Sequence, residues 1–469
     1  MSEISESRAV SGQYTPTMMT TNLRALLTET LERSETYLNS LDTRPVSPRD
    51  DAVAALKRLD VPLQSDPVDP AQVIRELDDI VTPATMAMSG PRFFGFVIGG
   101  SLPAALAAHW LSSAWDQNTG LYNSTPGTSH LEQVSLRWLL DLLDLPRESA
   151  GAFVTGTTVA HITALAAARH AVLAKAGWDV EANGLFGAPE VTVITGAEAH
   201  PTLYKALGVI GFGRKRVVRV PVDSQGRMRA DQMPKISGPT IVCVQVGNVN
   251  SGSCDDVKTI GRIAREQGAW VHVDGAFGLW ARVAPTRAHL VEGVEHADSW
   301  ATDAHKWLNV PYDSGIAFVR DKDALRKSMA VSAEYLPTET TNRNPSDYTP
   351  ELSRRGRGAD IWAALRSLGK KGVSEMIESN CRQARRFGEA LSKAGCQVLN
   401  DVVLNQVVVR FGDAERTRKV IAAIQRDGTL WAGETVWQGQ VAMRISVSCW
   451  ATTDADVEKS IEAIVRLSR

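Results

Sequence analysis

An aspartate and a lysine that each follow an apolar segment are the residues whose types and spacing suggest chemistry. Asp274 ends the run WVHVD, and Lys306 follows the strand-like ADSWAT, beside His305. Each has an ordinary explanation, because a strand-end aspartate often forms a turn or caps a helix, and such a lysine is usually solvated. On neighbouring strands, however, the lysine would suit imine formation with an aldehyde, and the carboxylate would keep a pyridine nitrogen protonated. Together they indicate a pyridoxal phosphate site.

A Gly-Thr-Thr turn ahead of a long helical segment offers a place for the phosphate. In FVTGTTVAHITALAAARH, the turn consists of Gly156, Thr157 and Thr158. Backbone N–H groups at a helix N-terminus bind anions, and glycine permits close approach of the backbone. An ordinary threonine N-cap explains the same segment. The segment has neither the GxGxxG spacing of a dinucleotide site nor the GK[ST] of a P-loop, which disfavours both alternatives.

His200 lies five residues past the apolar run VTVIT, at the start of a helical segment. A flat imidazole at this place is suited to stack on a pyridine ring, although a histidine at a helix start also makes local hydrogen bonds. We interpret five other histidines, which have no comparable context, as structural: His161, His170, His272, His289 and His296.

The middle of the chain predicts the elements that would position these residues. Short β-branched runs alternate with helical stretches, and they lie at 191–195, 216–222, 240–246, 270–274 and 315–320. Such alternation predicts a doubly wound α/β domain with a mostly parallel sheet. Ligands of these sheets bind beyond the carboxyl ends of the strands, where the polar residues above occur.

The two flanks of this domain have different patterns. From Thr21 to about Leu63, and again in AQVIRELDDIV, the periodicity is helical with little to bury alone, so we expect packing on the main body or on a partner subunit. After about Gly372, helices and short β runs are typical of a compact α+β module. We therefore predict an N-terminal helical segment, a large domain and a small domain, at 1–85, 86–372 and 373–469.

Composition disfavours several classes of function. Lys plus Arg (51) balance Asp plus Glu (53), and no basic arm is present, so we expect no nucleic-acid partner. Five scattered cysteines without a CxxC pair argue for reduced thiols, and we predict no metal site. Neither a secretory signal nor a membrane-spanning segment is evident, so we expect a cytoplasmic protein with no membrane partner.

The motifs HVDGAFG and DAHKWLNVPYDSGIAFVR, with thirty-two residues from Asp274 to Lys306, resemble the group II pyridoxal-phosphate decarboxylases. This family includes the aromatic amino-acid, tyrosine, histidine, glutamate and diaminobutyrate decarboxylases. The resemblance extends from PRFFGF, at about Pro91, to the C-terminal MRISVSCWATTDADV. It implies an aspartate aminotransferase-like fold of type I, with a large, mostly parallel seven-stranded sheet, an N-terminal helical segment and a small C-terminal α+β domain.

The resemblance also implies roles around the ring of pyridoxal 5′-phosphate. Lys306 would hold the cofactor as a Schiff base, and Asp274 would be the partner of the pyridinium nitrogen. Ala276 would contact the ring, while His200 would stack over it and touch the substrate.

Phosphate contacts follow from the same resemblance. Thr157 and Thr158 fall on the phosphate-binding turn, with His305 nearby. Ser353 corresponds to a contact that the neighbouring subunit donates, which implies an obligate homodimer with shared active sites.

Some positions depart from the family's pattern. Asp303 stands where relatives often carry asparagine. The segment GNVNSG places Asn248, Val249 and Asn250 where some members have threonines. Because valine cannot donate a hydrogen bond, Asn248 or Asn250 would have to make that polar contact.

Tyr335, in SAEYLPTE, matches the mobile-loop tyrosine that many family decarboxylases use to protonate the substrate Cα after carbon dioxide leaves. The surrounding polar sequence lacks periodicity, as expected of a lid, although a surface loop tyrosine is the alternative. Relatives with phenylalanine there tend toward aldehyde-forming oxidative chemistry, so Tyr335 favours simple decarboxylation.

We therefore predict decarboxylation of an L-amino acid to its amine and carbon dioxide. Aldehyde synthesis, transamination and carbon–carbon lysis on the same fold are alternatives, and so is a non-catalytic binding protein. Phe93, Phe94 and Phe96 lie in the segment that lines the substrate side chain in relatives, which is compatible with an aromatic substrate and with core packing. Gly99 and Gly120 stand where aromatic amino-acid decarboxylases tend to carry bulkier contacts, which indicates a reshaped pocket.

Overall fold

The computed structural model describes residues 22–331 and 342–469. Their contacts divide the chain into two compact units, one up to Ala87 and one from Met88 to Arg469, and each is considered by itself. Within the described residues, no helix combines the length and the apolar character that crossing a membrane requires.

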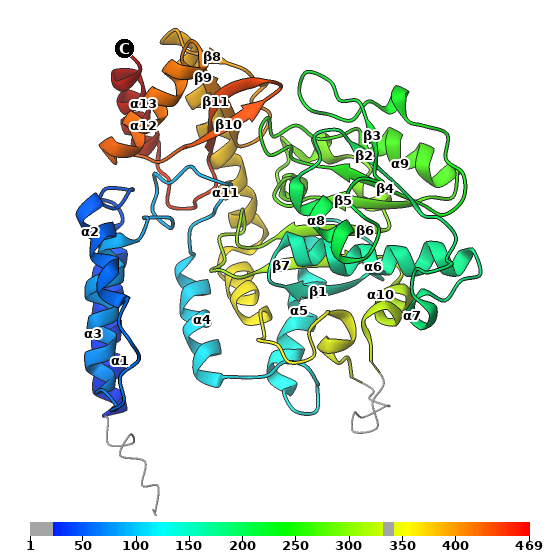
Figure 1. The fold of residues 1–469 in the computed structure, drawn as a ribbon, viewed down its shortest axis with the longest axis horizontal. Helices are drawn as coiled ribbons and strands as arrows, with labels where there is room; N and C mark the ends of the chain where they lie inside the picture. The colour runs from blue at the N-terminus through cyan, green and yellow to red at the C-terminus, as the bar shows by residue number, and fades with distance from the viewer. Residues whose placement is uncertain (1–21, 332–341) are drawn as a thin grey trace, which may run out of the picture. The chain divides into compact units, whose positions relative to one another are not determined.

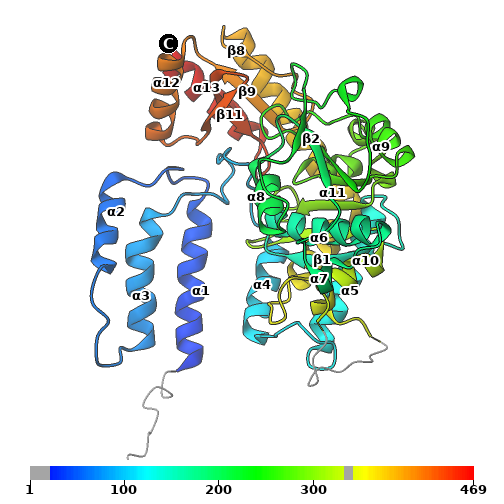
Figure 2. The same cartoon turned by 45° about the vertical axis from the view of Figure 1, so that its right-hand side comes forward.

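The N-terminal unit consists of helices α1 (Leu23–Ser40), α2 (Asp50–Ala55) and α3 (Pro70–Val81), which Figure 2 separates clearly. The side chain of Asn22 caps α1, while Asp69 caps α3 ahead of Pro70, a favoured first residue of a helix. Helix α1 has no buried residue. Its polar side is tied to α3 because Arg33 lies 2.7 Å from Asp78. The helices predicted for this segment are therefore present, with an apolar row left exposed.

The second unit is built around a seven-stranded sheet in the order β1-β7-β6-β5-β4-β2-β3 (Figure 1). The strands are β1 (Ala150–Val154), β2 (Thr192–Gly196), β3 (Val218–Val220), β4 (Thr240–Gln245), β5 (Trp270–Asp274), β6 (Ser299–Asp303) and β7 (Gly315–Val319). Strands β3, β2, β4, β5 and β6 are parallel, and β7 is antiparallel to both of its neighbours. This confirms the predicted mostly parallel sheet.

Helices cover this sheet. Helix α6 (Thr157–Lys175) lies along strands β5 to β7, and four of its alanines have zero exposure, so helix and sheet approach closely: Ala160, Ala164, Ala167 and Ala168. Helices α4 (Pro103–Trp115) and α5 (Pro126–Leu142) pack against the long α11 (Gly358–Lys393). The remaining helices of this part are α7 (Val180–Asn183), α8 (Pro201–Val209), α9 (Val257–Glu266) and α10 (Lys322–Met329).

A second, antiparallel sheet in the order β10-β11-β9-β8 forms the C-terminal module, which Figure 1 shows in orange to red beside the end of α11. Its strands are β8 (Gln397–Val398), β9 (Gln406–Arg410), β10 (Gly433–Trp437) and β11 (Gln440–Ser446), and its helices are α12 (Ala414–Asp427) and α13 (Asp454–Ser468). Strand β10 is not expected from the sequence. It is an edge strand whose first four residues alternate between half-buried and exposed, and only Trp437 at its end is buried, so it carries no apolar run.

Candidate active site

Strands β5 and β6 bring the predicted acid and lysine to one edge of the large sheet. They are parallel neighbours, with Asp274 opposite Ala301, so Asp274 and Asp303 end at the same edge. Lys306 lies in the turn after β6, and its Nζ is 2.9 Å from Asp303 Oδ2. The expectation that the two segments are neighbouring strands is confirmed.

Asp303 joins this lysine to the start of helix α6. Its Oδ1 accepts a hydrogen bond of 2.6 Å from the Thr157 backbone N–H, while its Oδ2 faces Lys306. Burial raises the pKa of Asp303, but Lys306, His305 and the Thr157 N–H together bring the pKa below its ordinary value. The ionised carboxylate therefore orients the lysine.

Asp274 is 4% exposed, and its Oδ1 accepts from the Ala276 N–H at 3.2 Å. Its Oδ2 lies 3.5 Å from His161 Nε2. Burial raises the pKa of Asp274, but His161 beside it and the Lys306 ammonium hold the pKa below its usual range. A buried, ionised carboxylate is the group that would keep a pyridine nitrogen protonated.

The Gly-Thr-Thr turn begins α6 as predicted, with Gly156 as the N-cap residue. The Thr157 hydroxyl is buried and has no hydrogen-bond partner among the described residues, and Thr158 is half-buried. A Cβ added at Gly315 would lie only 2.4 Å from the Gly156 Cα. The turn before α6 and the first residue of β7 therefore touch backbone to backbone.

His305 lies beside this turn and is 8% exposed. Its ring stacks on Tyr312 with centroids 4.2 Å apart, and its Nδ1 accepts from the Ser314 N–H at 3.0 Å. Nε2 lies 3.6 Å from Asp303 Oδ1. Burial, opposed by the charge of Asp303, lowers the pKa of His305. The imidazole is thus held rigidly at the same strand edge.

His200 is the N-cap residue of α8, and its Nδ1 lies 2.7 Å from the Thr202 hydroxyl. Burial lowers the pKa of His200, and the charge of Asp274, which raises it, does not compensate. A neutral imidazole near Asp274 and Lys306 is the result. The local hydrogen bond and the place beside the site are both present, so neither interpretation excludes the other.

The two asparagines of GNVNSG are already engaged. Asn248 Oδ1 accepts from the backbone N–H of Asn250, and its Nδ2 donates to Glu198 at 3.2 Å. Asn250 Oδ1 accepts from the Thr435 hydroxyl at 2.7 Å. Their side chains hold the loop and tie it to β10, so a cofactor contact would compete with these bonds.

Other predicted residues lie apart from this cluster or outside the described ranges. Ser353 is exposed, and its hydroxyl accepts from Asn118 Nδ2 at 3.2 Å. Phe93 and Phe94 are 1% exposed and belong to the core, whereas Phe96 is 56% exposed. Tyr335 falls within 332–341, outside the residues that the structure describes.

Two histidines that the sequence leads us to interpret as structural, His161 and His272, lie directly behind Asp274. His161 Nδ1 is 2.9 Å from His272 Nε2, and both rings are fully buried. The signal for His272 is present in WVHVD, because residues two apart on a strand face the same side of the sheet. His161 is one helical turn beyond Thr157, which places both on one face of α6.

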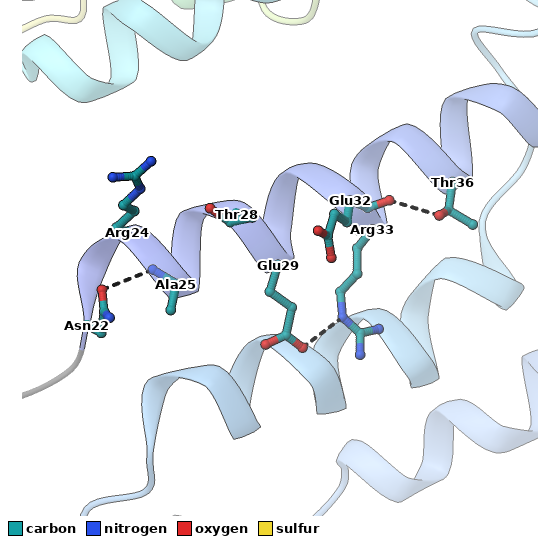
Figure 3. Close-up of a pocket in the computed structure, with 8 residues that line it drawn as sticks. All are labelled: Asn22, Arg24, Ala25, Thr28, Glu29, Glu32, Arg33 and Thr36. Carbon is teal, nitrogen blue, oxygen red and sulfur yellow. Dashed lines mark hydrogen bonds and ion pairs between the residues drawn. The ribbon is translucent and has the colours of Figure 1, made fainter.

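A separate hollow of about 790 Å³ lies on the N-terminal unit, along one side of α1 (Figure 3). Its polar groups already bond with one another: Glu29 pairs with Arg33, and Asn22 accepts from the Ala25 N–H. It contains none of the residues that gather at the ends of β5 and β6, and we do not regard it as the active site.

The residues at the sheet edge fit pyridoxal phosphate. A lysine amine is available for the aldehyde, and an ionised, buried carboxylate is available for the ring nitrogen. An unpartnered buried hydroxyl at a helix N-terminus suits the phosphate.

Comparisons with known proteins agree with this chemistry. The pyridoxal-dependent decarboxylase conserved domain matches residues 54–411. Tryptophan decarboxylase 1 of Oryza sativa subsp. japonica is 27% identical over 94% of this chain and 93% of its own. Aromatic-L-amino-acid decarboxylase of Bacillus atrophaeus is 25% identical over 89% and 90%. The crystal structure of Oryza sativa TDC with PLP and tryptamine has a TM-score of 0.88 at 24% identity, covering 97% of this chain and 99% of that one, which confirms the fold.

Proposed function

The chain belongs to the pyridoxal-dependent decarboxylase family and is an amino-acid decarboxylase that uses pyridoxal 5′-phosphate, and from this premise we propose that it converts an aromatic L-amino acid to the corresponding amine. The observation that carries the proposal is the strand edge where Asp274, Asp303 and Lys306 meet. The names of the relatives support the substrate class, since tryptophan and aromatic-L-amino-acid decarboxylases match nearly the whole chain.

The cofactor, when bound, supplies a protonated ring that accepts the electron pair left on Cα as carbon dioxide departs. Lys306 would bind it covalently, with Asp303 holding the lysine's ammonium proton beforehand. Asp274, with Ala276 next to it, would hold the proton on the ring nitrogen. Neutral His200 would offer a flat face to the ring without adding a positive charge that repels the pyridinium.

The phosphate would lie at the start of α6. Thr157 presents a free buried hydroxyl there, Thr158 follows it, and the ring of His305 borders the turn. The dipole of α6 favours an anion at this end. Asn248 and Asn250 would join only by giving up part of their present bonds.

Phe96 is the aromatic residue of the segment PRFFGF whose ring remains available to a substrate. It lies 5.2 Å from the Trp431 ring, whereas Phe93 stacks on Trp431 from within the core. An aromatic substrate would gain stacking energy of about 1 kcal/mol from such a ring.

Amine formation needs a proton at Cα, and we assign its delivery to Tyr335. Aldehyde synthesis is the second candidate, because 4-hydroxyphenylacetaldehyde synthase of Rhodiola rosea is 28% identical over 76% of this chain. The tyrosine at position 335 favours the amine.

We further propose a homodimer in which Ser353 reaches the partner's phosphate site. Exposed apolar side chains support an interface: Leu27 and Leu31 on α1 are 59% and 49% exposed, and Trp110 and Trp115 on α4 are 42% and 45% exposed. Sedimentation velocity at micromolar concentration should give the mass of two chains, and a single chain would refute the assembly.

The deciding experiment offers the purified holoenzyme tryptophan, tyrosine, phenylalanine, histidine and glutamate, and measures carbon dioxide, amine, aldehyde, ammonia and peroxide together. Amine and carbon dioxide in equal amounts from an aromatic substrate are expected. Aldehyde with peroxide would establish the second candidate, and turnover of glutamate alone would refute the aromatic assignment. Lys306→Ala should abolish both turnover and borohydride labelling, while Lys322→Ala, at an exposed site, should change neither.

A further inference from the structure

Behind Asp274, away from the edge where the cofactor would lie, a continuous row of buried polar side chains crosses the sheet and helix α6. His161 Nε2 is 3.5 Å from Asp274 Oδ2, and His161 Nδ1 is 2.9 Å from His272 Nε2. His272 Nδ1 is 2.8 Å from Ser299 Oγ, which is also 2.8 Å from Trp270 Nε1. Every member is at most 8% exposed. No role assigned above uses the four residues behind Asp274.

The far end of the row fixes the direction of its hydrogen bonds. An indole N–H only donates, so Trp270 donates to Ser299 Oγ. The serine hydroxyl can then give its own hydrogen to His272 Nδ1, the acceptor at 2.8 Å. If His272 donated to Ser299 instead, the serine oxygen would receive two hydrogens, and its own would lack an acceptor among the bonds described. Buried polar groups are rarely left in that state.

The same reasoning assigns the ring nitrogen that carries the proton in each of the two histidines. With Nδ1 accepting, neutral His272 carries its proton on Nε2 and donates it to His161 Nδ1. Burial lowers the pKa of His272 to about 3, which keeps this ring neutral. His161 then carries its proton on Nε2, which has no other partner among the described residues and faces Asp274. This arrangement gives each hydrogen bond of the row one donor and one acceptor, and it points the His161 Nε2–H toward Asp274 Oδ2, 3.5 Å away.

We propose that Trp270, Ser299, His272 and His161 form a positioning relay of neutral hydrogen bonds that presents one N–H to Asp274 and holds its carboxylate, ionised, against the ring nitrogen of the cofactor. A neutral donor stabilises the carboxylate without forming a full ion pair that would compete with the pyridinium. This inference rests on the proposed role of Asp274.

Helix α6 gives the relay a second consequence. Thr157 and His161 lie one turn apart on it, so the helix that would receive the phosphate also carries the donor to Asp274. Helix α6 would thereby contact the phosphate at one end of the cofactor and position Asp274, the partner of the ring nitrogen, at the other end.

A test that needs no cofactor is ¹⁵N nuclear magnetic resonance of the histidine-labelled full chain freed of pyridoxal phosphate. The signals of His161 and His272, assigned with His161→Gln and His272→Gln, should both show the tautomer with the proton on Nε2 at pH 8. A proton on Nδ1 of either ring, or a positively charged His161, would overturn the relay. A wild-type chain that binds no pyridoxal phosphate would instead refute the proposed function.

A second test separates the effect of the shape of the side chain at position 161 from the effect of its hydrogen bonds. His161→Leu fills the site but neither donates nor accepts, whereas His161→Gln can do both. The leucine variant should bind pyridoxal phosphate roughly tenfold to a hundredfold more weakly, as expected for one hydrogen bond to a charged group. The glutamine variant should stay within about threefold of the wild type, because it retains that bond.

The matched control is Thr163→Val, on the same helix and equally buried, whose hydroxyl donates to the Val159 carbonyl. It should lower the melting temperature without changing cofactor affinity. Equal cofactor affinity of His161→Leu and the wild type, or equally weak binding by the glutamine and leucine variants, would contradict the relay.

Discussion

At the scale of single residues, the carboxylate of Asp303 has the most contacts at the site, because it bonds both the Lys306 ammonium and the Thr157 N–H. The lysine's orientation and the start of α6 therefore depend on one charge. That charge also makes the strength of the contact depend on pH.

Asp303→Asn should reduce the stability of the chain freed of cofactor by about 2 kcal/mol at pH 7, the value for a hydrogen bond to a charged group. The pKa of Asp303 is lowered in the folded chain, so its contribution is present above the unfolded pKa and is lost as pH falls through the folded one. Urea unfolding at pH 7 and pH 3 should show the difference shrinking in acid. Asp60→Asn, at an exposed site, is the control; a constant difference would contradict the mechanism.

His200 should titrate below its ordinary value of about 6.5, because burial penalises its charged form. The folded chain therefore keeps the neutral ring to lower pH than a free imidazole would, and stability falls as the pH drops below the unfolded value toward the lower folded one. The chemical shift of the His200 Cε1 proton, assigned with His200→Gln and followed against pH, measures the midpoint of the titration. A midpoint at or above 6.5 would show that the imidazole is charged at the site and unsuited to stack on a pyridinium.

At the scale of elements, the strands were the most predictable part. The segment WVHVD is β5 to the residue, since the apolar run begins two residues after Gly268 and ends directly before Gly275. The contact between His161 and Asp274 was not predictable, because it joins a helix to a strand more than a hundred residues away and depends on packing. The engagement of Asn248 and Asn250 was hidden for the same reason, as their partners come from distant segments.

Helix α1 exposes a row of leucines that the N-terminal unit does not itself bury. Leu27→Glu with Leu31→Glu should therefore weaken self-association at least tenfold, because charged side chains would have to be desolvated in the interface. Sedimentation equilibrium measures the change. Thr28→Glu, on the same turn but outside the row, should leave association intact, and an unchanged double variant would place the interface elsewhere.

At the scale of the whole second unit, the C-terminal sheet is fastened to the loops of the large sheet. Trp437 Nε1 donates to Glu198 at 2.9 Å, and Gln438 donates to the same carboxylate at 3.2 Å. Glu198 stands two residues before His200. The C-terminal module therefore contributes to the position of the His200 imidazole through Glu198.

Trp437→Phe keeps an aromatic side chain but removes the indole N–H, and it should cost about 1.5 kcal/mol of stability together with a measurable loss of cofactor affinity. Trp178→Phe is the matched control, because it removes an indole hydrogen bond to the Gly184 carbonyl in another part of the unit. The control should cost stability alone. Equal cofactor affinities in the two variants would show that the hydrogen bond from Trp437 to Glu198 does not influence the cofactor site.

The backbone contact between Gly156 and Gly315 bears on how the protein fails. No side chain separates the Gly-Thr-Thr turn from β7, the strand that follows Lys306, so neither segment can move while the other stays in place. On heating, pyridoxal phosphate should be lost in the same transition in which the structure around Gly156 and Gly315 unfolds. A sample that keeps the yellow colour of the bound cofactor should therefore still be folded.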